Sequence, residues 1–119
     1  MNLKALALSA LVSASTLFGA LPAEARPSTC WAGPEYGTLE AFGCDVTRRV
    51  DANGNPVWII YVNGITTHVW LYHDEYTEMP TYAEILFQGE YARTTVGWYI
   101  DDQGDIRLVS DGEEFAFRR

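Results

Sequence analysis

Short runs of alternating apolar and polar residues, separated by turns that contain glycine, occupy most of the chain after residue 40. The clearest is VWIIYVNGITTHVWLY at residues 57–72, where two β-rich runs flank Asn63-Gly64. Asn-Gly favours a two-residue type I′ turn, because both residues tolerate a positive φ. The turn predicts a hairpin in which Val62 faces Ile65. Both faces of this hairpin are apolar, so either both are covered, or one covers a core and the other meets a partner.

Four further turns extend this hairpin into a sheet. They are expected at residues 51–55, 88–89, 102–104 and 111–112, each of which contains glycine. The turn at 88–89 would join a strand at 82–87 directly to a long strand at 90–101. All four registers place the apolar residues of the strands on one common face, and this agreement is the strongest structural indication in the sequence.

The fold class follows from this one apolar face. We predict an all-β domain, an antiparallel up-and-down meander of about seven strands. Strand twist and the need to cover free edges would roll it into a small barrel or half-barrel. Residues 36–39 are a candidate for an eighth strand. The one long connection is expected at residues 73–81, which are acidic and contain Met-Pro.

The first 25 residues have the pattern of a cleaved export signal. Lys4 provides the positive charge, residues 5–21 are largely apolar, and Ala23-Glu24-Ala25 is a small-x-small cleavage site. We predict cleavage before Arg26, which leaves residues 26–119 as a single β domain that is secreted or periplasmic.

Two cysteines, Cys30 and Cys44, lie in this domain. In an exported chain such a pair predicts one disulfide, which would stabilise the fold by about 3 kcal/mol for a loop of about fourteen residues. The disulfide would tether an N-terminal arm, residues 31–37, to the first strand. A redox or metal site is the alternative, which the spacing of the two cysteines disfavours.

The charge of the chain narrows the choice of partners. The net charge is −8, and removing Lys4 and Glu24 from the eight basic and sixteen acidic residues leaves seven arginines and fifteen acids. Phosphate backbones and anionic lipid surfaces would be repelled, so we expect neither nucleic acid nor membrane binding. A cationic partner is compatible with this charge, as is an acidic surface that only keeps the protein soluble.

Candidate catalytic chemistry is sparse. His73-Asp74-Glu75 is the only compact acid–base cluster, and neither a nucleophile nor a set of metal ligands accompanies it. Residues 51–55 begin like a calcium loop, but Pro56 stands where that loop requires Gly. Three carboxylates at residues 101–105 leave a weak cation site open. We expect no enzyme activity, no metal site and no cofactor.

The second face of the central hairpin is the candidate binding site. In the predicted register it gathers an aromatic and polar set that would suit a sugar ring or a peptide: Arg49, Tyr61, His68, Trp70 and Tyr72. Burial beneath the N-terminal arm, the acidic loop or a second copy of the chain is the alternative. On the opposite face, Arg48 and Trp58 are expected to form a core or cation–π pair.

Two functions from different classes follow. The first is a non-enzymatic binding module for a glycan or a protein, using the aromatic face. The second is a periplasmic inhibitor or interaction protein that engages a cationic partner through Asp74, Glu75 and Glu78 of the acidic loop. An enzyme that uses His73 is less favoured than either.

Overall fold

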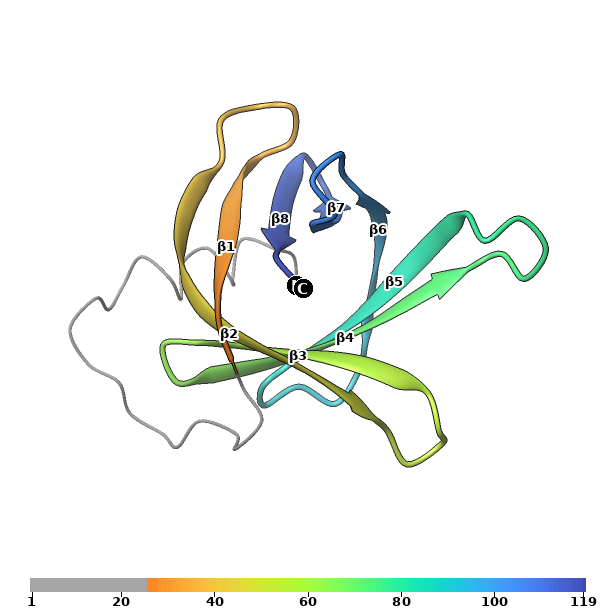
Figure 1. Ribbon diagram of the computed structural model, residues 1–119. Helices are drawn as coiled ribbons and strands as arrows, with labels where there is room; N and C mark the ends of the chain where they lie inside the picture. The colour runs from red at the N-terminus through yellow and green to blue at the C-terminus, as the bar shows by residue number, and fades with distance from the viewer. Residues whose placement is uncertain (1–25) are drawn as a thin grey trace.

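The strands and tight turns expected from the sequence close into a barrel (Figure 1). The computed structural model describes residues 26–119, so the expected signal peptide lies outside the described residues. Eight antiparallel strands follow one another around the barrel in sequence order: β1 (Arg26–Pro34), β2 (Glu40–Val50), β3 (Pro56–Val62), β4 (Ile65–His73), β5 (Pro80–Phe87), β6 (Thr94–Ile100), β7 (Ile106–Ser110) and β8 (Glu113–Phe117). The predicted all-β meander is confirmed, and of the predicted alternatives the structure is the barrel rather than the half-barrel.

The central hairpin β3–β4 has the predicted register. Asn63 and Gly64 have φ values of 50° and 81°, as a type I′ turn requires, and Val62 pairs with Ile65. Because side chains alternate along a strand, this register sends Ile60 into the barrel and its neighbour Tyr61 outward. The type of turn formed by these two residues therefore decides which face of the hairpin packs in the core.

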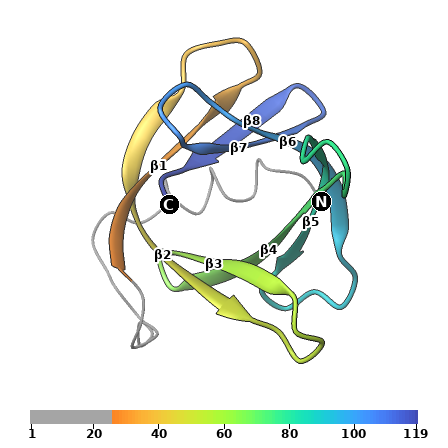
Figure 2. The ribbon, with the colours of Figure 1, turned by 45° about the vertical axis from the view of Figure 1, so that its right-hand side comes forward.

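The barrel interior is filled by apolar side chains from all eight strands. Among them are fully buried residues from opposite sides of the ring, Ile60, Val69, Ile85, Leu108 and Phe115. Interiors of eight-stranded barrels are just wide enough to be filled in this way. Figure 2 shows the ring of strands that surrounds this core.

Strand β1 closes the barrel by pairing with both β2 and β8. The segment expected as a tethered arm therefore largely belongs to the barrel wall, and the prediction of a strand at residues 36–39 is wrong, because Glu35 and Tyr36 turn the chain into β2. The predicted disulfide is confirmed. Cys30 and Cys44 bridge β1 and β2 from inside the barrel, with their Cα atoms 6.0 Å apart. This covalent bond fastens the closing strand to its neighbour.

The predicted turn at residues 88–89 is present, because the Glu90 N–H donates to the Phe87 carbonyl, but the prediction that it leads directly into a strand at residue 90 is wrong. Gln88 remains attached to β4, since its backbone N–H donates to the Thr66 carbonyl and its side-chain oxygen accepts from the Thr66 N–H. The chain then needs the longer connection 88–93 to enter β6, and Ile85 pairs with Thr94. The shift is two residues, so the same side chains still face the core.

The β4–β5 hairpin projects from the barrel (Figure 1). Residues 83–85 of β5 pair with residues 94–96 of β6, and the part of β5 before Ala83 has no pair in β6. At the same level β4 has an irregularity between Leu71 and His73. The wall is therefore less tightly paired at this end of the barrel, which is also where β1 begins and β8 ends. Among residues 26–119 no helix is long and apolar enough to cross a membrane.

Candidate functional site

The five residues of the predicted aromatic site all lie on the outer surface of strands β2 to β4. His68 stacks on Trp70, with ring centroids 5.9 Å apart, and Tyr72 stacks on Tyr82 of β5 at 4.7 Å. Arg49 is exposed beside Val57, while Tyr61 is buried opposite Thr66. The structure thus brings His68, Trp70 and Tyr72 into one row and sets Arg49 and Tyr61 on neighbouring strands.

Trp70, at the centre of this row, is covered by the chain itself. Its side chain is 6% exposed, and the Arg93 guanidinium lies 3.6 Å from the ring centroid. The indole N–H donates to Asp51 Oδ2 at 3.0 Å. Hydrogen bonds from the Asn55 backbone and then from Trp70 hold the pKa of the Asp51 carboxyl below its usual range. One ring face and the polar edge of Trp70 are therefore already occupied.

The polar groups next to Trp70 also satisfy one another. Tyr72 donates its hydroxyl hydrogen to Glu84 Oε1 at 2.8 Å, and Arg93 lies 3.3 Å from the same oxygen. The hydrogen bond to Glu84 raises the pKa of Tyr72, whereas burial lowers the pKa of His68. This outer cluster is a set of mutual contacts, with few groups left to bind a ligand.

The acidic loop is the tip of the β4–β5 hairpin. Asp74 Oδ1 accepts hydrogen bonds from the backbone N–H groups of Tyr76 and Thr77, which lower the pKa of Asp74 and close the turn. Glu75 and Glu78 are exposed, and Tyr76 is 93% exposed. Asp74 therefore shapes the loop, and the two glutamates carry its accessible charge.

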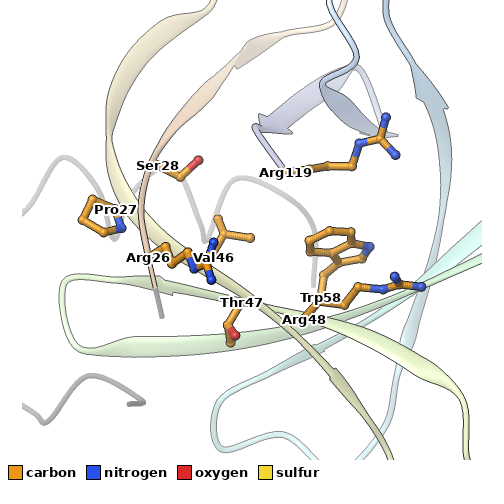
Figure 3. Close-up of a pocket in the computed structure, with 8 residues that line it drawn as sticks. All are labelled: Arg26, Pro27, Ser28, Val46, Thr47, Arg48, Trp58 and Arg119. Atoms are coloured by element: carbon orange, nitrogen blue, oxygen red, sulfur yellow. The ribbon is translucent and has the colours of Figure 1, made fainter. Parts of the chain in front are cut away.

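The open end of the barrel holds a site of different chemistry. A hollow of about 450 Å³ lies between the start of β1, the end of β2 and the C-terminal Arg119 (Figure 3). Trp58, Arg48, Arg119 and Arg26 are among the residues that line it. A second hollow of about 280 Å³ shares Arg48, Trp58 and Arg119 with the first and extends toward Trp98. We call the two hollows together the barrel mouth.

Each of the two tryptophans of the mouth, Trp58 and Trp98, is held in place by a contact with a neighbouring residue. Trp58 packs on Phe117, with ring centroids 5.9 Å apart, and Phe117 is fully buried in the core. Trp98 donates its indole N–H to the Tyr72 carbonyl at 2.8 Å, near the irregularity of β4. The mouth therefore has a packed floor, and Trp98 links β6 to β4 where the β5–β6 ladder has ended.

The arginines of the mouth extend over this floor. The Arg48 guanidinium lies 5.6 Å from the centroid of the Trp58 ring, and Arg119 Nε donates to the Gly104 carbonyl at 3.2 Å. Within residues 26–119, Arg93, Arg107 and Arg118 form ion pairs with carboxylates, and none of these pairs involves Arg26, Arg48 or Arg119. The mouth is a local positive region on a chain of net charge −8.

The expected cation–π pair of Arg48 and Trp58 is confirmed, but its place in a ligand-sized mouth was missed. The signal was present: Arg48 follows Cys44 and Val46 on the inward face of β2, and a charged residue there predicts the end of the packed core. Arg119 and Trp98 could not be assigned to the same site from the sequence, because neither belongs to a strand that is next in sequence to β2, the strand of Arg48.

The three carboxylates at residues 101–105 do not form a cation site in this geometry. Asp101 binds Arg107, and Asp105 is held by Arg118. Among the described residues, no group of three or more His, Cys, Asp or Glu side chains could hold a metal ion.

Compared with protein-family models, with curated protein sequences and with solved structures, the chain has no match in any of the three.

Proposed function

We propose that this protein is a non-enzymatic binding module that takes a small ligand in its barrel mouth. The observation that carries the proposal is the position of Trp58, which lines both hollows and is flanked by Arg48 and Arg119. Ligand pockets are typically about 300–1,000 Å³, combine apolar walls with a few polar groups, and often lie in the mouths of β-barrels. The first hollow lies within this size range and the second just below it, and together they combine apolar side chains such as Trp58 and Trp98 with arginines.

Binding without catalysis agrees with the groups that line the mouth. The Ser28 hydroxyl donates to the Arg118 carbonyl at 2.7 Å, so its proton is engaged by the backbone. His73 lines the second hollow, whereas Ser28 lines the first. A nucleophile needs a base within hydrogen-bond reach, and these two residues lie in different parts of the mouth. The wall therefore offers contacts to a ligand rather than a reaction centre.

The indole N–H signals of the four tryptophans provide the test, because only Trp58 and Trp98 line the mouth. The full chain, labelled with ¹⁵N, would be titrated with a panel of organic anions, alcohols and saccharides. We expect at least one compound to shift the signals of Trp58 and Trp98 while Trp70 remains in place. A panel that shifts only Trp70 would favour the outer aromatic face, and one that shifts none of the four would contradict the proposal.

A protein partner at the β4–β5 hairpin is the second candidate. Tyr76 and Met79 are 93% and 63% exposed beside Glu75 and Glu78, and aromatic and Met side chains are enriched at protein interfaces. A cationic protein would bind here with an affinity that falls as salt is added. The test is a Glu75→Gln/Glu78→Gln variant, which should weaken that association and leave ligand binding in the mouth unchanged.

We also propose that the protein acts outside the reducing cytosol, in a periplasm or beyond the cell. The Cys30–Cys44 bridge supports this location, since such disulfides form and persist in oxidising compartments. Fractionation of the native host, followed by mass measurement of the mature chain, would test both the compartment and the expected cleavage before Arg26.

A further inference from the structure

The barrel mouth combines guanidinium groups with apolar side chains. Arg48, Trp58 and Arg119 line both hollows, and Arg26 lines only the first. The apolar Leu71, Trp98 and Ile100 line only the second hollow, beside His73. A ligand that spans both hollows would place a polar end at the shared guanidinium groups and an apolar end toward Trp98, with Trp58 beneath it.

The guanidinium groups indicate the charge of the polar end. In the described chain Arg107 and Arg118 each bind carboxylates at 2.8–3.0 Å, although these two side chains are partly exposed. Arg48 instead lies over the Trp58 ring, and Arg119 donates to the Gly104 carbonyl. Guanidinium groups bind carboxylates, sulfates and phosphates in a fork geometry. An anion is therefore the ligand group that would pair with the guanidinium groups of the mouth.

The packing below the mouth limits the length of the apolar end. Phe117, Ile106 and Ile60 are at most 1% exposed, so the barrel interior beneath Trp58 is filled. The accessible apolar surface extends sideways instead, toward Trp98 and Ile100, and Ile100 is 44% exposed. A short acyl chain or a fused pair of rings would cover this surface.

From these observations we infer that the ligand is a small anionic amphiphile, with its anionic head at Arg48 and Arg119 and its apolar body on Trp58 and Trp98. The inference rests on the proposed function of the mouth. Polyanions such as nucleic acids are disfavoured, because the rest of a chain with a net charge of −8 would repel them. A small molecule with one anionic group can reach the mouth, because it meets that repulsion at few points.

Matched pairs of probes test the class of ligand. Octanoate and 1-octanol share an acyl body, and 1-naphthoate and 1-naphthol share a ring body, so that each pair differs mainly in the charged head. In titrations of the full ¹⁵N-labelled chain, we expect each anion to shift the indole signals of Trp58 and Trp98 with an affinity about tenfold above that of its neutral counterpart. The tighter of the two anions identifies an acyl or an aromatic body.

Variants locate the head group. Arg48→Gln/Arg119→Gln is expected to weaken octanoate binding about tenfold and to leave octanol binding within about twofold. Arg49→Gln is the control, because it removes one positive charge from the same strand as Arg48 but on the opposite face. Arg26 is left intact, since it adjoins the expected cleavage site. Unchanged signals of Trp31 and Trp70 would verify that the variants keep the fold.

Three outcomes would overturn the inference, and they differ in what they say about the mouth. If octanol binds as tightly as octanoate, or if the double variant binds octanoate like the parent protein, the mouth is a ligand site for which an anionic head is not required. The same holds if a saccharide shifts Trp58 while both anions do not. If no compound shifts Trp58 or Trp98, both the inference and the proposed function are wrong.

Discussion

Two groups of arginines differ in how their charge is balanced. The outer group is Arg107 on β7 and Arg118 just after β8, and the other group is Arg48 and Arg119 at the barrel mouth. Arg107 Nε lies 2.8 Å from Asp101 Oδ2, and its Nη1 lies 2.8 Å from Glu114 Oε2, while Arg118 makes a two-pronged contact with Asp105. At the mouth, Arg48 lies over Trp58 and Arg119 donates to a carbonyl. The outer arginines are held by carboxylates of the fold, whereas the mouth arginines contact an aromatic ring and a backbone carbonyl.

Burial of the carboxylates explains this difference. Glu114 and Asp105 are 6% and 4% exposed, and a buried carboxylate is costly unless a cation and hydrogen bonds compensate it. Strands β7 and β8 place Arg107 beside Glu114, and the residues at their ends place Arg118 beside Asp105. No such buried carboxylate accompanies Arg48 or Arg119 among the residues that line the mouth. The positive charges of Arg48 and Arg119 therefore compensate no buried carboxylate of the mouth, and the comparison predicts different consequences of mutation.

The largest expected effect is on the stability of an outer-arginine variant. Arg107→Gln leaves Glu114 buried without its cation, and we expect the free energy of unfolding to fall by about 2 kcal/mol, less than for a fully buried pair because Arg107 is partly exposed. Arg48→Gln should change it by less than about 0.5 kcal/mol. Urea denaturation of both variants measures the contrast. Equal losses would show that the two groups of arginines serve the same structural purpose.

A smaller effect of about 1 kcal/mol is expected from Asp101→Asn at pH 7, because the amide can keep the backbone hydrogen bonds but not the ion pair. Burial opposes ionisation of Asp101, yet the hydrogen bonds from Arg107 and the backbone leave its pKa below the usual value. A lowered pKa stabilises the fold above the unfolded value of about 3.9, and this stabilisation disappears as the pH falls through the folded value.

The difference in stability between the parent protein and Asp101→Asn should therefore narrow as the pH is lowered below about 4. Urea denaturation at a series of pH values checks this trend. A difference that stays constant down to the lowest accessible pH would contradict the assigned role of the Asp101 charge.

An effect between those of the two groups is expected for Arg93, which contacts both a carboxylate and an aromatic ring. Its pair with Glu84 is partly exposed, so Arg93→Gln should cost about 0.5–1 kcal/mol, including the loss of its contact with the Trp70 ring. The indole signal of Trp70 should move, while those of Trp58 and Trp98 stay in place. A shift of all three would indicate that the outer cluster and the mouth are coupled.

The outer aromatic face shows how much of the strand register can be predicted from sequence alone. Alternation along β3 and β4 correctly placed His68, Trp70 and Tyr72 on one side of the sheet. This alternation could not show that Trp70 is covered. The residue that covers it, Arg93, belongs to the connection 88–93, which the turn residues predicted to be shorter than it is. A hydrogen bond between Gln88 and Thr66, residues far apart in sequence, decided that path.

The sequence by itself determined the strand order, most of the registers and the Cys30–Cys44 bridge. These features depend on local turn chemistry, on the two-residue period of a strand and on cysteine spacing, all of which can be read along the chain. Only the tertiary structure decided that β1 closes the ring and that Arg48, Trp98 and Arg119 share one mouth. Closure brings together residues from both ends of the described range 26–119, and that proximity depends on how far the sheet curls, which no local pattern specifies.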